Sequence, residues 1–218
     1  MTNGQEEYRT QYKANTNAQF PSTRMRRLRR SGWMREMVTE NRLTPADLIL
    51  PLFIIEGTNT REPITSMPDV NRLSIDNACE TAQRAQDIGI PAIALFPAID
   101  SALKDEQGSE ALNPDNLICR AIQAIKQAAP DIGIITDIAL DPYTTHGHDG
   151  VLGDKGDILN DESVEILCKQ ALTQAQAGAD IIAPSDMMDG RIGAIRNTLE
   201  NNDFKDCLLY TSPSPRDA

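Results

Sequence analysis

The sequence contains few aromatic residues, and most of its charge is of one sign. Phe, Trp and Tyr make up 4% of the 218 residues, whereas the hydrophobic fraction as a whole reaches 40%. Small aliphatic side chains of this kind suit helices that pack on a parallel sheet. The formal net charge of −11 argues against a nucleic-acid partner, which needs a basic surface to meet phosphates.

Long apolar runs are also missing. No segment reaches the 18 consecutive apolar residues of a membrane span, and the first residues contain no apolar core of a secretory signal. The four cysteines form no CxxC pair, and three of them fall inside helical patterns, where a free buried thiol is the usual outcome. These cysteines are Cys79, Cys119, Cys168 and Cys207. We therefore expect a reducing, cytoplasmic setting and no membrane partner.

One basic run departs from the acidic composition, because Arg24 to Arg30 contains five arginines in seven residues. On its own such a run could contact RNA or an anionic membrane surface. A solvated or subunit-bridging arm is the interpretation we prefer, since residues 1–32 are polar and show no period. The sequence thus predicts an N-terminal oligomerisation arm over 1–32.

Apolar strand-like runs and helical patterns alternate over residues 33–206. The predicted strands are 48–55, 92–96, 133–138 and 180–183, and the predicted helices are 74–88, 113–128, 161–178 and 189–201. The polar residues expected to cap these helices are Ser74, Asn113, Asp161 and Asp189. Four βα units of this kind give either a doubly wound sheet or half of a (β/α)8 barrel, and the Ala-rich helices favour the barrel. Neither GxGxxG nor GxxxxGK[ST] occurs, so the sequence contains neither of these nucleotide-binding motifs.

A polar cluster begins where the predicted strand 133–138 ends. It holds three carboxylates and two imidazoles, namely Asp137, Asp141, Asp149, His146 and His148. Carboxylates can act as oxygen ligands or acid/base groups, and the imidazoles could bind metal or shuttle protons. The alternative is a surface loop whose Asp and His residues serve turns and caps. Asp137 is the strongest candidate because it lies directly at the strand end.

A second polar cluster follows the predicted strand 180–183. Ser185 and Asp186 come after that strand and before a helix, so they should face the same rim as Asp137. Arg191 lies in the first turn of that helix. Its guanidinium could meet a carboxylate or bridge to a neighbouring loop.

Three motifs in this order and spacing resemble those of the porphobilinogen synthase family, also called 5-aminolevulinate dehydratases. They are Arg24-x-Arg-Arg-Leu-Arg, Asp137-x-Ala-Leu-Asp-Pro-Tyr-Thr-x-His-Gly-His-Asp-Gly and Ala183-Pro-Ser-Asp-Met-Met-Asp-Gly-Arg191. The resemblance runs from about Arg24 to Asp206. It implies a (β/α)8 TIM barrel with an N-terminal arm, of which this chain carries about the first half, in a homo-octamer. It also implies condensation of two 5-aminolevulinate molecules to porphobilinogen, with loss of two waters, in tetrapyrrole (haem) biosynthesis.

The resemblance also assigns expected roles to individual residues. Asp137 and Ser185 match family positions that line the substrate pocket. In the zinc-dependent branch three cysteines of the central loop hold the metal, and those positions here are Ala139, Asp141 and Asp149. Thiolates prefer zinc, whereas carboxylates suit harder cations. The chain therefore resembles the branch that uses Mg²⁺, with Asp141 and Asp149 as candidate metal residues and no zinc expected.

Lysines matter to this chemistry because a lysine amine can form an imine with each ketone substrate. The family uses two such lysines, the first in a Tyr-Ser-x-Lys strand shortly after the position of Asp206. Lys205 lies in a predicted helix-to-strand connection, so we do not assign it this role. The remaining lysines of the barrel region fall in predicted loops or helices: Lys104, Lys126, Lys155 and Lys169. A different Schiff-base or metal-assisted lyase on a barrel is disfavoured for the same reason.

The regular alternation of predicted strands and helices ends after Asp206. Residues 207–218 contain a Ser-Pro-Ser-Pro run that neither a central strand nor a helix tolerates. We expect residues 33–206 to be the N-terminal portion of the barrel and 207–218 to be a tail outside the family pattern, such as a sequencing artefact. Two hypotheses follow: the chain represents a porphobilinogen synthase whose sequence is cut short, or it is a non-enzymatic, inactive fragment of that enzyme. For the chain as written we expect inactivity.

Overall fold

The computed structural model describes residues 20–211, and the chain divides into two compact units. The first unit is Met1–Leu43 and the second is Thr44–Ala218. The division falls later than the predicted boundary at residue 32, because helix α2 (Gly32–Met37) belongs to the first unit.

The described part of the first unit is short and has no core of its own. It consists of the 3-10 turn η1 (Met25–Arg29) and helix α2, and none of residues 20–43 is buried. The guanidinium of Arg24 lies 4.1 Å from the centre of the Phe20 ring. Trp33 remains 63% exposed. Most polar and apolar side chains of residues 20–43 are thus exposed.

The second unit is built on a seven-stranded sheet with the order β2-β3-β1-β4-β5-β8-β9. Its main strands are β1 (Ile49–Ile54), β4 (Ala92–Pro97), β5 (Gly133–Ile138) and β8 (Ile181–Pro184). These four pair in parallel, each next to the one before it in the chain. A doubly wound sheet needs a point where the strand order reverses, and the main strands have none. The predicted barrel-type arrangement is therefore confirmed over the doubly wound alternative.

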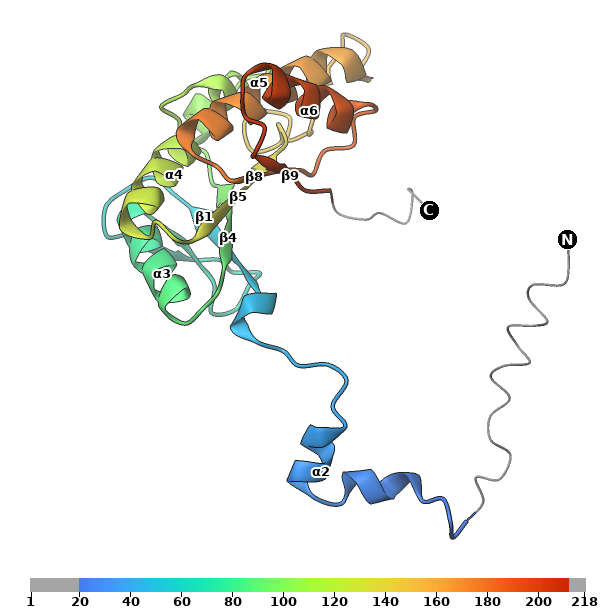
Figure 1. Ribbon diagram of the computed structural model, residues 1–218. Helices are drawn as coiled ribbons and strands as arrows, with labels where there is room; N and C mark the ends of the chain where they lie inside the picture. Colours follow the sequence, from blue (N-terminus) through green and yellow to red (C-terminus); the bar gives the residue numbers. More distant parts are fainter. Residues whose placement is uncertain (1–19, 212–218) are drawn as a thin grey trace, which may run out of the picture. The chain divides into compact units, whose positions relative to one another are not determined.

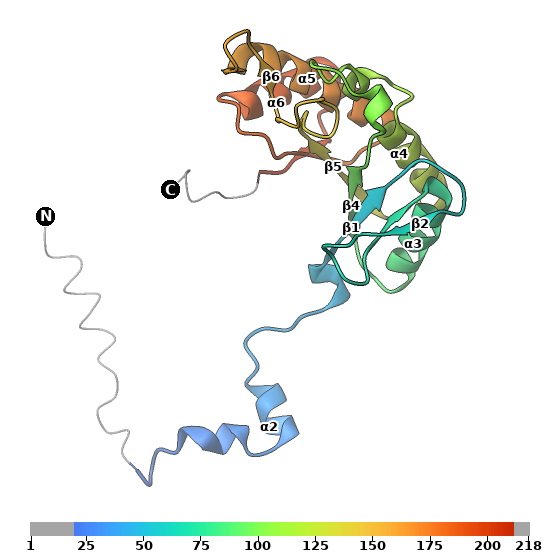
Figure 2. The same ribbon diagram turned by 180° about the vertical axis from the view of Figure 1, so that it is seen from behind.

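Four helices connect and cover these strands: α3 (Ile75–Asp87), α4 (Leu117–Ala128), α5 (Asn160–Ala177) and α6 (Arg191–Asn201). Figures 1 and 2 show them following one another along one side of the strands. The remaining short turns are η2 (Pro45–Asp47), η3 (Ser101–Leu103) and η4 (Ser109–Leu112). The alternation of strand and helix predicted for this region is confirmed.

Four short strands within residues 33–206 lie where no strand was predicted. β2 (Arg61–Pro63) and β3 (Asn71–Leu73) form a hairpin, and β3 pairs with β1. β6 (Val151–Leu152) and β7 (Ile158–Leu159) form a second hairpin inside the region expected to be one long loop. Segments of two or three residues are too short to show a strand period, so they escape prediction from the sequence.

Strand β9 (Leu208–Leu209) lies beyond the predicted boundary at Asp206. It pairs in parallel with β8, and Cys207 beside it is 8% exposed. The sheet therefore continues past that boundary. The Ser-Pro-Ser-Pro run begins at Ser212, outside the described residues.

The helix starts differ in detail from the predicted caps. Helix α4 is capped by Asn116, whose side chain accepts a hydrogen bond from the Cys119 backbone N–H at 2.9 Å. The Asn113 side chain instead accepts from the N–H of Asp115, in a turn before the helix. The prediction that Asn113 caps this helix was wrong, because the turn delays the helix by three residues. Helix α6 likewise follows Gly190 (φ 78°) rather than Asp189.

The two faces of the sheet are filled differently. Successive strand residues point to opposite faces, and on β5 the side chains of Ile134, Thr136 and Ile138 point toward the helices and are 0% exposed. Asp137, between them, points the other way and is half-buried. On that second face Phe53 and Phe96 are register partners, with ring centroids 5.7 Å apart. The hydrophobic core therefore lies between the strands and the helices.

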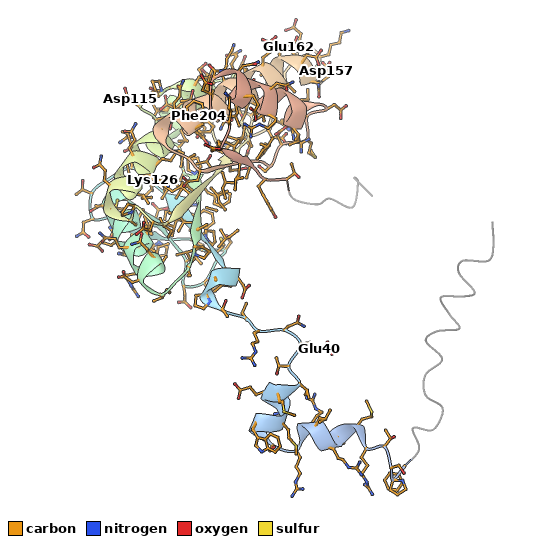
Figure 3. The ribbon with its side chains drawn as sticks, in the orientation of Figure 1. Glu40, Asp115, Lys126, Asp157, Glu162 and Phe204 are labelled. Atoms are coloured by element: carbon orange, nitrogen blue, oxygen red, sulfur yellow. The ribbon has the colours of Figure 1, made fainter. Side chains whose placement is uncertain are left out.

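The amino ends of β5 and β8 are tied together by one carboxylate. Asp180 Oδ2 accepts hydrogen bonds from the Ile134 backbone N–H at 2.7 Å and from Lys126 Nζ at 2.5 Å. Lys126 belongs to α4 and is labelled in Figure 3. This junction connects a helix and two strands at the end of the sheet opposite the carboxylate-rich loops.

The sequence predicted buried free thiols at the three cysteines in helical patterns, and of these only Cys119 is buried. All four cysteines are free thiols, with Cys119 and Cys207 buried and the other two half-buried. Within the described residues, no helix is long and apolar enough to cross a membrane.

Candidate active site

The carboxyl ends of β5 and β8 bring the two predicted pocket residues together. Asp137 is the register partner of Ala183, and the Ser185 backbone N–H donates to the Ile138 carbonyl at 3.3 Å. Asp137 and Ser185 are therefore neighbours at the rim of the sheet, one half-buried and one exposed. Their catalytic role stays a prediction, but their adjacency follows directly from parallel pairing.

Asp137 lies where its surroundings raise the pKa of its carboxyl above the ordinary value. Burial raises the pKa of its carboxyl, the hydrogen bond from the Ser185 side chain opposes that rise, and the charge of Asp141 adds to it. Carboxyl groups whose pKa is raised toward neutrality are suited to donating and accepting protons. A carboxyl group with a raised pKa therefore lies beside a hydroxyl group at this rim.

Asp186 is a further candidate that the sequence placed on the rim without a role. The alternation of β8 continues past its end, so that Pro184, Asp186 and Met188 are buried and Ser185 is exposed. The Asp186 side chain thus lies on the helix side of the sheet, where it is 0% exposed. An extended continuation of β8 would have predicted this orientation.

Arg191 is the cation that faces Asp186. Its Nε lies 3.1 Å from Asp186 Oδ2, without hydrogen-bond geometry, and the other carboxylate oxygen accepts from the Met188 N–H at 2.8 Å. Burial raises the pKa of Asp186 to about 6, although Met188 and Arg191 both oppose the rise and Asp149 adds to it. Of the two alternatives for Arg191, the structure shows the contact with a carboxylate.

The loop after β5 holds the other two carboxylates. Burial raises the pKa of Asp141, the negative charge of Asp149 raises it further, and the nearby Lys104 ammonium lowers it. Lys104 follows η3 in the loop after β4, so a neighbouring loop supplies its charge. Sequence alone gave no sign of this approach, because the two residues are far apart along the chain.

His146 uses both ring nitrogens within the rim. The His148 backbone N–H donates to His146 Nδ1 at 3.1 Å, and His146 Nε2 lies 3.1 Å from the Glu106 carbonyl. In the tautomer that fits both contacts, Nδ1 accepts and Nε2 donates. In this arrangement His146 joins the loops after β4 and β5, and neither nitrogen is available to a metal.

Gly150 lets the loop after β5 approach the helix side closely. A Cβ atom there would lie 2.8 Å from Ile158 Cγ2 and from Ser163 Oγ, and 3.0 Å from Met188 Cε. The Ser163 hydroxyl also accepts a hydrogen bond from the Val151 N–H at 2.9 Å. The close packing fixes the chain next to Asp149, and only a residue without a side chain fits.

The donor set around the loop bears on which metal it could take. Across residues 20–211, no three His, Cys, Asp or Glu side chains are gathered as a ready metal site. Asp141 and Asp149 are nevertheless close enough to interact electrostatically. Two carboxylates suit Mg²⁺, which commonly retains several waters, better than Zn²⁺, which takes three or four protein ligands in its usual sites.

Lysines lie away from the described strands. Lys104 follows η3, Lys126 and Lys169 are in helices, and Lys155 is in the turn between β6 and β7. Lys205 follows α6 and pairs with Asp203 at 3.2 Å. The predicted position of these lysines outside the strands is confirmed within residues 20–211.

Parallel strands added in chain order, helices along one side and polar residues at the carboxyl rim define an α/β protein of the barrel class. The family model for delta-aminolevulinic acid dehydratase matches residues 22–212. The chain therefore belongs to the delta-aminolevulinic acid dehydratase family.

Individual relatives support this assignment. The delta-aminolevulinic acid dehydratase of Bradyrhizobium diazoefficiens is 60% identical over 177 residues, which cover 81% of this chain and 50% of the relative. The Rhodobacter capsulatus protein of the same name is 49% identical over 88% of this chain and 58% of its own length. The chain thus spans about half the length of the curated relatives it matches.

A solved structure agrees with the fold. It is the delta-aminolevulinic acid dehydratase (porphobilinogen synthase) of Toxoplasma gondii in complex with the reaction product porphobilinogen. The two structures superpose with a TM-score of 0.83 at 45% identity, covering 87% of this chain and 54% of the Toxoplasma chain. The predicted TIM-barrel class is confirmed, with part of the barrel represented here.

Proposed function

We propose that this chain supplies the Asp137–Ser185 side of a porphobilinogen synthase site, which condenses two 5-aminolevulinate molecules. The observation that carries the proposal is the adjacency of these residues at the carboxyl rim of β5 and β8, in a chain of this family. The Toxoplasma relative was solved with porphobilinogen bound, which supports the same product class. Asp137 would accept or donate a proton at the substrate, and the Ser185 hydroxyl would orient that carboxyl.

We also propose that these 218 residues do not complete the condensation alone. The family resemblance implies two imine-forming lysines, and no described strand carries a lysine. Incubation with 5-aminolevulinate followed by a colour test for porphobilinogen should give no product. Borohydride treatment of the same mixture should trap no covalent adduct on a rim lysine. Product formation or a trapped adduct would contradict this part of the proposal.

Ligand binding tests the site directly. In ¹H–¹⁵N spectra of the chain, 5-aminolevulinate should shift the amides around Asp137 and Ser185. The variant Asp137→Asn should weaken those shifts, whereas Asp131→Asn, an exposed acid at the opposite end of β5, should leave them unchanged. Shifts confined to other regions, or equal effects of the two variants, would overturn the proposed site.

We propose Mg²⁺ as the cation that Asp141 and Asp149 take, with no role for zinc. The support is the pair of interacting carboxylates at loop positions where the zinc branch carries cysteines. Titration with Mg²⁺ should shift the amides of both residues, and Asp141→Asn should reduce the effect. Asp154→Asn, in the exposed β6–β7 turn, is the matched control. Preferential Zn²⁺ binding by the unaltered chain would contradict the proposal.

We propose that the first unit contacts neighbouring subunits in a homo-octamer. Its support is the exposed apolar surface of residues 20–43, none of which is buried, including Met25 (83% exposed) and Trp33 (63%). Sedimentation of the chain and of Trp33→Ser should show a smaller assembly for the variant. A cytoplasmic setting also remains a proposal, supported by four free thiols.

A further inference from the structure

Helix α5 turns two glutamines into the protein interior. Gln170 is 0% exposed and Gln174 is 1% exposed, and they lie one helical turn apart. Leu167 and Ala171, on the same side of the helix, are also 0% exposed. Glutamine is seldom fully buried unless its amide is hydrogen-bonded, so each of these positions calls for a physical explanation.

Gln170 has such a partner and Gln174 does not. Gln170 Nε2 donates a hydrogen bond to the Ala139 carbonyl at 3.2 Å. Within residues 20–211, neither polar atom of the Gln174 side chain has a hydrogen-bond partner. Two glutamines with the same exposure, on the same helix face, therefore differ in one contact with the backbone after β5.

The carbonyl that accepts the hydrogen bond from Gln170 lies where the chain leaves strand β5. Ala139 is the first residue after β5 and lies two residues beyond Asp137, and it is 2% exposed. The preceding carbonyl, that of Ile138, accepts from the Ser185 N–H. Two successive carbonyls are thus held by different elements, one by the segment after β8 and one by α5.

We propose that Gln170 is a positioning residue for the candidate active site. By holding the Ala139 carbonyl, it fixes the direction in which the chain leaves β5 and keeps the Asp137 carboxyl beside Ser185. The importance of Gln170 for catalysis rests on the proposed function, whereas the effect of Gln170 on the local geometry does not. Misplacement of a reacting group by about 1 Å is enough to reduce a rate by roughly a hundredfold.

Methionine tests the contact, because it is close to glutamine in size and cannot donate the hydrogen bond. Gln170→Met leaves the buried Ala139 carbonyl without its donor, and Gln174→Met is the matched control on the same helix face. The Tyr143 and Thr144 amides report on the local structure, since both donate to the Leu140 carbonyl, at 2.8 Å and 3.0 Å. We expect these two amides to exchange with solvent about tenfold faster in Gln170→Met and at an unchanged rate in Gln174→Met.

A second measurement separates positioning from a loss of general stability. The Asp137 carboxyl carbon can be titrated by ¹³C NMR in the folded chain. In Gln170→Met the titration midpoint should move upward, because the Ser185 hydrogen bond that lowers the pKa is weakened. In Gln174→Met it should stay where it is, whatever that variant does to the unfolding midpoint.

Glutamic acid at the same position provides a conditional rescue. In Gln170→Glu the protonated side chain can donate to the Ala139 carbonyl, whereas the ionised side chain cannot. Protection of the Tyr143 and Thr144 amides should therefore return at low pH and be lost as the glutamate ionises. This variant keeps the test decisive if Gln170→Met does not fold.

The outcomes distinguish this inference from the proposed function. If Gln170→Met and Gln174→Met change exchange and titration alike, or if Gln170→Glu shows no conditional protection, the positioning role is wrong. That result would leave 5-aminolevulinate binding at Asp137 intact. If the variants differ as expected but the chain binds no 5-aminolevulinate near Asp137, positioning stands and the proposed function fails.

Discussion

The two faces of the parallel sheet differ in what covers them. On the helix side, Ile134, Ile138 and Ile182 are 0% exposed, whereas on the other face Ile49 is 54% exposed and Phe53 is half-buried. Parallel sheets are normally covered on both faces, and in a barrel the second face is closed by the sheet itself. Stability in the described residues therefore comes mainly from the helix side, while the candidate chemistry at Asp137 belongs to the other face.

Asp186 is the exception to that division, because it is a carboxylate on the helix side. Its neighbour Ser185 follows the rule and is exposed. Burying a carboxylate requires a compensating partner, and Arg191 and the Met188 N–H fill that role only in part, since the pKa stays raised. The comparison thus predicts that the faces respond differently to mutation and to pH.

The largest difference should appear between adjacent isoleucines of β8. Ile182→Ala removes a side chain that is 0% exposed against the helices and should lower the free energy of unfolding by about 3 kcal/mol. Ile181→Ala, on the other face, removes a half-buried side chain and should cost about 1 kcal/mol. Urea denaturation of both variants measures the two values. Equal losses would show that the two faces contribute alike.

The second effect is a pH dependence caused by Asp186. Its pKa is about 6 in the folded chain and about 3.9 when unfolded, so the folded state holds the proton more tightly. The resulting stabilisation is complete below about pH 4 and is lost as pH rises through about 6. Relative to Asp186→Asn, the unaltered chain should lose about 2 kcal/mol of unfolding free energy across this window.

Urea denaturation at pH 4, 5, 6 and 7 measures how the free energy of unfolding changes with pH. Asp189→Asn, an exposed neighbour, serves as the control and should keep the profile of the unaltered chain. An Asp186→Asn variant that retains the full slope would assign the pH dependence to other carboxyl groups, with Asp137 the first to examine.

Close packing where the loop after β5 meets the helix side gives the third prediction. Gly150→Ala forces a Cβ to within 2.8 Å of Ile158 and Ser163 and should destabilise the fold by about 1.5 kcal/mol. Gly193→Ala, inside α6 with nothing within 4 Å, should instead stabilise it by about 0.5 kcal/mol. Thermal or urea unfolding shows whether each substitution raises or lowers the stability of the fold. If Gly150→Ala left the free energy of unfolding unchanged, the loop would be able to move away without a loss of stability.

The smallest effect concerns Thr136, which adjoins Asp137 but faces the helices. Its hydroxyl is buried and makes no hydrogen bond with any residue in the range 20–211. Thr136→Val replaces it with a methyl group and should stabilise the chain by about 0.5 kcal/mol. Thr198→Val is the control, because the Thr198 hydroxyl donates to the Ala194 carbonyl at 2.9 Å and its loss should give no gain. The change in urea midpoint decides between these outcomes.

Sequence patterns predicted the elements that carry their own periodicity. Strand β8 is an apolar run between Asp180 and Ser185, β5 begins with the run Gly-Ile-Ile, and α3 buries Ala78, Ala82 and Ala85 as its spacing indicated. The cap of α4 was missed because Asn113 and Asn116 are chemically equivalent, and only the turn between them decides which one caps the helix.

The candidate site was predictable to the extent that parallel strands align their ends. Asp137 and Ser185 could be placed together for that reason, whereas three-dimensional packing alone brings Lys104 near Asp141. The position of Gln170 could not be predicted either, because a glutamine in a helical pattern is normally expected to face solvent. Its role depends on a carbonyl 31 residues earlier in the chain.

The Asp180 junction has a consequence for how this protein can change over time. It fastens α4, β5 and β8 at their shared base, through Lys126 and the Ile134 N–H, and uses nothing from the rim. Substitution of exposed rim residues such as Ser185 therefore leaves this junction at the base unchanged. Exposed rim positions can thus vary without weakening the base, whereas buried rim residues such as Leu140 and Gly150 remain tied to the packing of the fold.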